Sequence, residues 1–149
     1  MNPKRILLSL LAAFIVLSGT DYLIHEVWLK STYALNVGTL WRDAAGMKDH
    51  MLGIFVGQFM VAIAFAMLWA RISIGGAGIQ CAIALGFFLG LAYSGAAVIQ
   101  GAVQPLPSGL VTKWIISGIA QSILTGIVLF LVNKPAKGCP DISGICLSR

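Results

Sequence analysis

The sequence is short of charge: only 10 % of its 149 residues are Asp, Glu, Lys or Arg, whereas 58 % are hydrophobic. A chain of this composition cannot cover its apolar surface with polar side chains in water. Its length has room for one domain and for no separate soluble domain. The scarcity of charge therefore excludes a water-soluble globular fold and predicts a single domain, residues 1–149, embedded in lipid.

The sequence also lacks the short motifs of common enzymes. It has no glycine-rich phosphate loop, no Gly-x-Ser-x-Gly turn around a nucleophile and no metalloprotease helix. No motif therefore indicates a hydrolytic or nucleotide-driven enzyme. The sequence favours a protein that is not an enzyme.

The net charge of +5 does not indicate nucleic-acid binding. The lysines and arginines stand singly or in pairs beside apolar segments, which is typical of membrane anchoring. Two of the three cysteines, Cys139 and Cys146, lie in a polar tail, and their spacing fits neither a redox Cys-x-x-Cys nor a zinc knuckle. In a cytoplasmic tail they are expected to be reduced thiols.

Four apolar segments are long enough to cross a bilayer, residues 6–29, 51–70, 78–100 and 111–132, followed by a tail at 133–149. Backbone groups in lipid must be paired within a helix or a closed barrel, and these runs lack the period-two alternation of barrel strands. The basic start has no small-x-small cleavage site after it, so the first segment is interpreted as a retained span. The sequence predicts an all-α fold, a four-helix transmembrane bundle.

The distribution of Lys and Arg predicts the orientation of the bundle. With the N-terminus inside, six of these residues lie on the inner side and four on the outer side. Cytoplasmic loops carry the excess of positive charge. We therefore expect both termini in the cytoplasm.

A polar stretch, residues 20–30, ends the first apolar segment. Asp21 and His25 are four residues apart and share a helix face. At 1.5 Å per residue, Asp21 lies roughly 22 Å along the span and still at hydrocarbon depth. An intramembrane carboxylate indicates a functional site, or else a protonated or hydrogen-bonded group that fixes the helix register.

The same depth calculation supplies candidate partners for Asp21, each about 15 Å below the outer end of its helix. They are Gln58, Tyr93 and Gln121. If the side chains converge, they form a small polar site that opens outward past His25. If they diverge, they are isolated contacts between helices.

His25 and His50 are the only histidines, and both are expected near the outer ends of adjacent helices. Two such imidazoles can bind a transition metal or ligate a haem from both sides. No His-x-x-x-His or Glu-x-x-His pair favours this hypothesis. Rim histidines also bond to interfacial backbone or take part in a proton path.

Glycines spaced for close helix contact occur on three of the four segments. The predicted packing positions are Gly53, Gly57, Gly86, Gly90, Gly118 and Gly126.

Several short motifs resemble a family of small, uncharacterised bacterial four-helix membrane proteins. They are the run Asp-Tyr-Leu-Ile-His at 21–25, Leu-Trp-Arg at 40–42, Gly-Gln at 57–58 and Gln-Pro at 104–105. The resemblance extends to about Val132 and leaves out the cysteine-containing tail. It implies the fold and a multi-pass location in the bacterial inner membrane, and it implies no catalytic activity.

These observations leave three hypotheses for function. The first is a non-enzymatic bundle that acts as an accessory or interaction subunit of a larger membrane complex or as a homo-oligomer, with lipid, other membrane subunits or itself as partners. The second is a small proton-coupled transporter or channel that uses Asp21 and His25. The third is a metal or haem protein ligated by His25 and His50.

Overall fold

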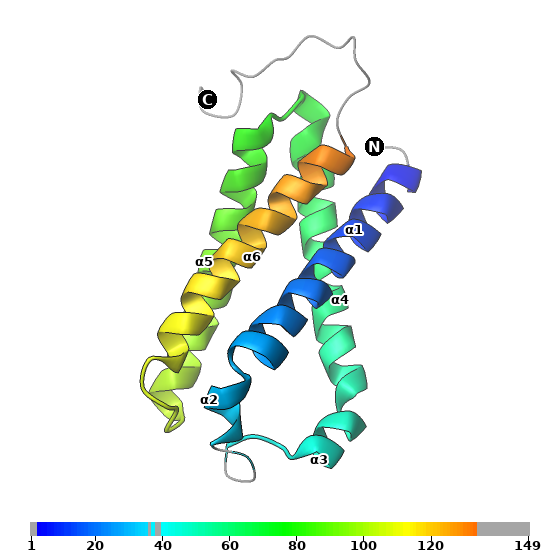
Figure 1. Ribbon diagram of the computed structural model, residues 1–149. Helices are drawn as coiled ribbons and strands as arrows, with labels where there is room; N and C mark the ends of the chain where they lie inside the picture. The colour runs from blue at the N-terminus through cyan, green and yellow to red at the C-terminus, as the bar shows by residue number, and fades with distance from the viewer. Residues whose placement is uncertain (1–2, 36, 38–39, 134–149) are drawn as a thin grey trace.

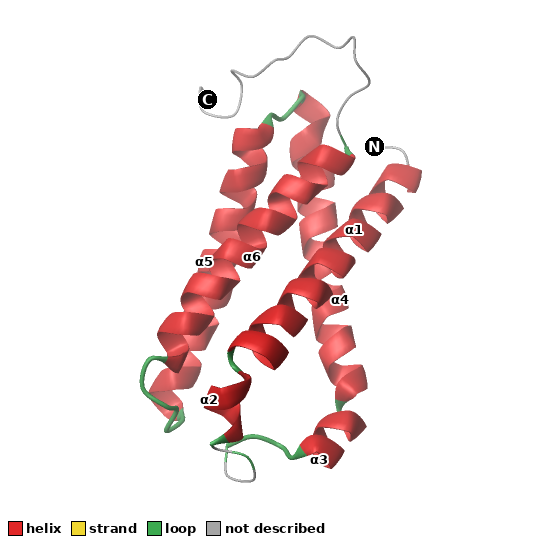
Figure 2. Cartoon of the chain, in the orientation of Figure 1, coloured by secondary structure: helices red, strands yellow, loops and turns green. Residues whose placement is uncertain are grey.

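The long apolar segments form four helices in a computed structural model, which describes residues 3–35, 37 and 40–133 (Figure 1). The first helix, α1 (Pro3–Tyr22), continues into a π-helical segment, η1 (Leu23–Trp28). The others are α4 (Met51–Ile72), α5 (Ile79–Val103) and α6 (Leu110–Val132). All four are long and apolar enough to cross a membrane, and the described residues contain no β-strand (Figure 2). The predicted all-α four-helix fold is confirmed.

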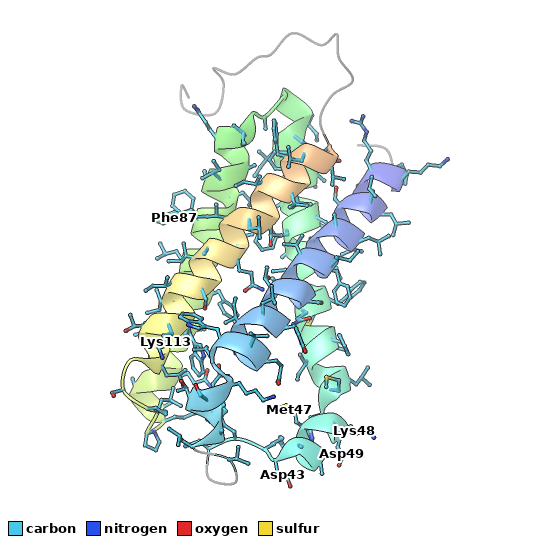
Figure 3. All side chains as sticks on the ribbon, viewed as in Figure 1. Asp43, Met47, Lys48, Asp49, Phe87 and Lys113 are labelled. Carbon is cyan, nitrogen blue, oxygen red and sulfur yellow. The ribbon has the colours of Figure 1, made fainter. Side chains whose placement is uncertain are left out.

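Two short helices, α2 (Lys30–Ala34) and α3 (Ala44–Asp49), connect α1 to α4. The side chain of Asp43 caps α3 by accepting a hydrogen bond from the backbone N–H of Gly46 at 2.8 Å. We call the end of the bundle that carries α2, α3 and the turn 104–109 the loop end (Figure 1). The acidic and basic side chains of α3, and Lys113 at the start of α6, are found there (Figure 3).

The opposite end, which we call the terminal end, holds the start of α1 and the end of α6 (Figure 1). The side-chain amide of Asn133 ties the two together by donating to Ser9 Oγ at 2.8 Å. The α4–α5 connection lies at the same end and passes through a short 3₁₀ helix, η2 (Ser73–Gly75), and through Gly76 at φ 79°. The start of α1 and the end of α6 therefore lie at the same end of the bundle, and the cytoplasm as the side on which that end lies remains a prediction.

The two C-terminal helices, α5 and α6, form the most extensive helix pair. Three glycines allow their backbones to touch. A Cβ atom at Gly86 would lie 2.6 Å from the Cα of Ile123, and one at Gly90 would lie 2.8 Å from the Cα of Ile119. One at Gly126 would overlap the carbonyl oxygen of Ala82. Close backbone approach through small residues is how helices associate in lipid.

The glycines of α4 behave differently. A Cβ atom at Gly53 or Gly57 would meet nothing within 4 Å. The side of α4 that faces the bundle is marked by the buried Ala62, Phe65 and Trp69, and at 100° per residue the two glycines point the other way. Predicted packing within the chain is therefore wrong for Gly53 and Gly57, because spacing alone does not say which way a stripe faces.

The tightly packed core occupies the terminal half of the bundle. α1 lies between α4 and α6, and α4 buries no residue before Ala62 (Figure 1). Large apolar side chains such as Phe87 point outward from the bundle, as expected for a surface that meets hydrocarbon chains (Figure 3). In the loop half, Phe14 of α1 touches the rings of Phe55 and Phe59, and polar side chains complete the connection to α4.

Candidate functional site

Asp21 stands in the last turn of α1 and receives hydrogen bonds from two other helices. Gln58 of α4 donates through Nε2 to Asp21 Oδ2 at 2.6 Å. Gln121 of α6 donates through Nε2 to Asp21 Oδ1 at 2.8 Å. Each carboxylate oxygen is therefore bonded to a different helix, and one side chain joins α1, α4 and α6.

The two glutamines are themselves held in position. Ser18, one turn before Asp21, donates its hydroxyl to Gln58 Oε1 at 2.6 Å. Gln121 Nε2 also donates to the backbone carbonyl of Leu17 at 3.0 Å. Because a carboxylate can only accept, the end of the Gln58 amide that contacts Asp21 is the nitrogen, and the Ser18 hydroxyl then donates to the oxygen. We call Ser18, Asp21, Gln58 and Gln121 the Asp21 network.

The donors to Asp21 are carboxamides, which carry no charge. A charged group at the centre of a membrane helix costs about 2.5–3.5 kcal/mol on insertion scales, and such groups face the bundle interior or water and find partners there. Hydrogen bonds from amides occupy the oxygens of the carboxyl group but bring no positive charge. A proton or a cation can still supply that charge.

A second cluster lies at the loop end, where η1, α2 and α6 meet. His25 Nδ1 is 2.6 Å from the hydroxyl of Tyr33, and Trp114 donates its indole N–H to the same hydroxyl at 2.8 Å. The ring of Trp41 packs edge-on against Tyr33 and Trp114, with ring centroids 5.1 and 6.0 Å away. We call His25, Tyr33, Trp41 and Trp114 the rim cluster.

The environment of Tyr33 links the two clusters. Burial raises the pKa of Tyr33 above its ordinary value of 10.0, and the hydrogen bond from Trp114 partly offsets this rise. Negative charge on Tyr93, Asp21 and Glu26 raises the pKa further. Tyr33 thus lies within electrostatic reach of the Asp21 carboxylate and stays a neutral O–H group near pH 7.

Tyr93, a predicted partner of Asp21, approaches the site from α5. Its ring crosses Gly118 of α6, where a Cβ atom would lie 3.3 Å from Tyr93 Cδ1. The Tyr93 side chain is 59 % exposed and within electrostatic range of Asp21. The hydrogen bonds that the structure gives Asp21 come from the two glutamines instead.

The two histidines have different partners. His25 contacts Tyr33, whereas His50 Nδ1 bonds to the backbone carbonyl of Gly46, four residues earlier, at 2.9 Å. Within residues 3–35, 37 and 40–133, no group of three or more His, Cys, Asp and Glu side chains is placed to hold a metal ion. The tail cysteines Cys139 and Cys146 lie outside the described residues.

Sequence reasoning identified Asp21, His25, Gln58 and Gln121 but missed the residues that orient them. Helix spacing alone could have pointed to Ser18, because it lies three residues before Asp21 on the same helix face. Trp114 lies seven residues before Gln121, again on one face. Tyr33 follows a π-helical segment and a short helix, and its position in space has no sequence signal.

Comparisons of the chain with protein-family models, with curated proteins and with solved structures found no match. The family resemblance of the sequence motifs therefore remains a prediction. The function must be inferred from the geometry of the site.

Proposed function

We propose that this membrane bundle takes up and releases a proton at Asp21, as part of a small proton-coupled transporter or channel. The observation that supports the proposal is the Asp21 network, in which two helices direct neutral side chains at a carboxylate that a third helix carries in a membrane-spanning segment. Perturbed or isolated carboxylates in such segments mark proton relays and ion paths.

The network gives protonation a mechanical consequence. In the ionised form, both Asp21 oxygens accept hydrogen bonds, one from α4 and one from α6. A protonated carboxyl group makes one of those oxygens a hydroxyl, which donates well and accepts only weakly from an amide N–H. The contact with α4 or with α6 is then weakened or rearranged. Proton uptake at Asp21 would therefore loosen one helix against the other two.

The two glutamines differ in how they can adapt. Gln58 can turn its amide over, because the Ser18 hydroxyl can accept as well as donate, whereas turning Gln121 over would remove the donor to the Leu17 carbonyl. The Gln121 side of the network is thus organised in advance for the ionised carboxylate. A ligand that favours one of two arrangements shifts the population between them, and here the ligand is the proton.

Proton flux into liposomes tests this proposal. The full chain is reconstituted with an internal pH dye, and a potassium gradient with valinomycin drives protons inward. We expect acidification faster than in protein-free vesicles, and Asp21→Asn should reduce it to the leak of protein-free vesicles, because asparagine keeps the size and cannot titrate. Asp49→Asn, at an exposed carboxylate of α3, is the control and should leave the flux unchanged. Equal flux in wild type and Asp21→Asn, or no wild-type flux, contradicts the proposal.

A second candidate function is association with another membrane chain or with a second copy of this one. It is favoured by Gly53 and Gly57, which are spaced for close helix contact, yet a Cβ atom at either would meet none of the described residues within 4 Å. On this hypothesis the chain is a non-enzymatic interaction subunit of the bacterial inner membrane, with both termini in the cytoplasm.

Cross-linking in unperturbed membranes, followed by gel analysis, checks the association. We expect a species larger than the monomer in the wild type. Gly57→Ile should reduce that species and leave the monomer folded, because the added side chain enters open space within the chain. A wild-type protein that is only monomeric, or an unchanged oligomer in Gly57→Ile, counts against this candidate.

A further inference from the structure

We propose that Tyr33, held by Trp114, is a positioning residue that fixes the tautomer of His25, with the ring proton on Nε2. The functional meaning of this inference rests on the proposed proton path, whereas the assignment of the tautomer does not. It follows from the contacts of one hydroxyl group, which joins η1, α2 and α6.

The argument is a count of donors and acceptors. The indole N–H of Trp114 can only donate, so the Tyr33 oxygen is the acceptor of the 2.8 Å contact. The phenol has one hydrogen to give, and its remaining short contact is to His25 Nδ1 at 2.6 Å. When Tyr33 donates there, Nδ1 carries no proton, and the neutral imidazole bears its proton on Nε2.

The other tautomer of His25 would leave the hydroxyl hydrogen of Tyr33 without an acceptor in the rim cluster. If Nδ1 carried the proton, the Tyr33 oxygen would accept from both His25 and Trp114, and its own O–H would have to turn away from both. The raised pKa of Tyr33 means that this O–H is present at neutral pH. The stacked arrangement of the two rings, 15° from parallel, holds the nitrogen and the hydroxyl in a fixed relation.

His50 provides an opposite case within the same chain. Its Nδ1 contacts the backbone carbonyl of Gly46 at 2.9 Å, and a carbonyl can only accept. In His50 the proton is therefore on Nδ1, and Nε2 is bare. The two histidines of this protein should be opposite tautomers when both are neutral.

This assignment gives His25 a defined direction in the proton path. The carboxylates of Asp21 and Glu26 act electrostatically on its ring, and Tyr33 is the titratable group that contacts it from α2. In the neutral ring Nε2 carries the N–H and donates, while Nδ1 accepts from the Tyr33 hydroxyl, which keeps its own proton. His25 therefore presents a neutral N–H donor on the Nε2 side of its ring, away from Tyr33.

Nitrogen NMR of histidine-labelled protein in lipid nanodiscs tests the inference. At a pH well above the ordinary histidine pKa of about 6.5, protonated and bare ring nitrogens have separate ¹⁵N shifts, and His50→Gln assigns the signals. We expect a protonated Nε2 in His25 and a protonated Nδ1 in His50. In Tyr33→Phe and in Trp114→Phe, His25 should become a mixture of tautomers. Trp41→Phe changes a ring of the same cluster without removing a bond to Tyr33, and it should leave the tautomer unchanged.

The outcomes separate the positioning role from the proposed function. A protonated Nδ1 in wild-type His25, or an unchanged tautomer in Tyr33→Phe, overturns the inference even if Asp21-dependent flux is observed. The expected tautomers with no wild-type proton flux leave the positioning intact and refute the transport proposal. Where flux is present, Tyr33→Phe should lower it.

Discussion

Alanine at Gly126 is expected to destabilise the bundle by about 2 kcal/mol, the middle of the range for overpacked interiors. A methyl group there overlaps the carbonyl oxygen of Ala82 and lies 3.1 Å from its carbonyl carbon. Backbone atoms cannot rotate aside as a side chain can, so α5 and α6 must separate along their most extensive contact. Unfolding of the full chain in mixed micelles, followed by circular dichroism against SDS fraction, measures the change.

Gly57→Ala is the matched control because the same atoms are added where nothing lies within 4 Å. Alanine is intrinsically better than glycine inside a helix by roughly 0.5–1 kcal/mol. The control is therefore expected to be neutral or stabilising, and the two substitutions should differ in sign. Equal effects of the two alanines would contradict the close approach of α5 and α6.

The other glycines of the α5–α6 contact should follow in a graded order. A Cβ atom at Gly86 meets the backbone of Ser122 and Ile123, so alanine there should be as harmful as at Gly126. At Gly118 the nearest neighbour is the ring of Tyr93, at 3.3 Å, and a side chain can move aside. The neighbouring atom, rather than the glycine itself, determines the cost.

The contrast among the glycines shows what the sequence can and cannot predict. The length of each span is set by the thickness of the bilayer, and the rise per residue is constant. The depth of Asp21, Gln58 and Gln121 could therefore be calculated, and in the structure the three side chains converge, which is one of the two alternatives that depth alone left open. The direction in which a side chain points around its helix depends on how the helices are rotated, which depth does not give.

The same reason explains the mistake at Gly53 and Gly57 and the position of Tyr93. Rotation of α4 turns its glycines away from the bundle, and Tyr93 lies over Gly118 rather than bonding to Asp21. The π-helical segment that carries His25 could not be predicted either, because Leu23–Trp28 contains no proline or glycine that would indicate an irregular helix. His25 of this segment contacts Tyr33, which in turn accepts a hydrogen bond from Trp114 of α6.

Leucine at Gln121 is expected to destabilise the bundle by about 1–3 kcal/mol, because the half-buried Asp21 carboxylate loses one of its two side-chain donors. The substitution removes the donor to Asp21 Oδ1 and to the Leu17 carbonyl together. SDS unfolding of the reconstituted chain measures the loss.

A double-mutant cycle separates the Asp21–Gln121 interaction from general damage. In the Asp21→Leu background the carboxylate is already absent, so Gln121→Leu should cost less by about 1–2 kcal/mol, near the upper end of couplings between membrane helices. Ser94→Ala is the comparison, because Ser94 bonds only within α5, to the Gly90 carbonyl at 2.7 Å. Its effect should add to that of Asp21→Leu without coupling. Additive losses for Asp21 and Gln121 as well would mean that the two side chains stabilise the bundle independently, and Asp21 could not then transmit its protonation to α6.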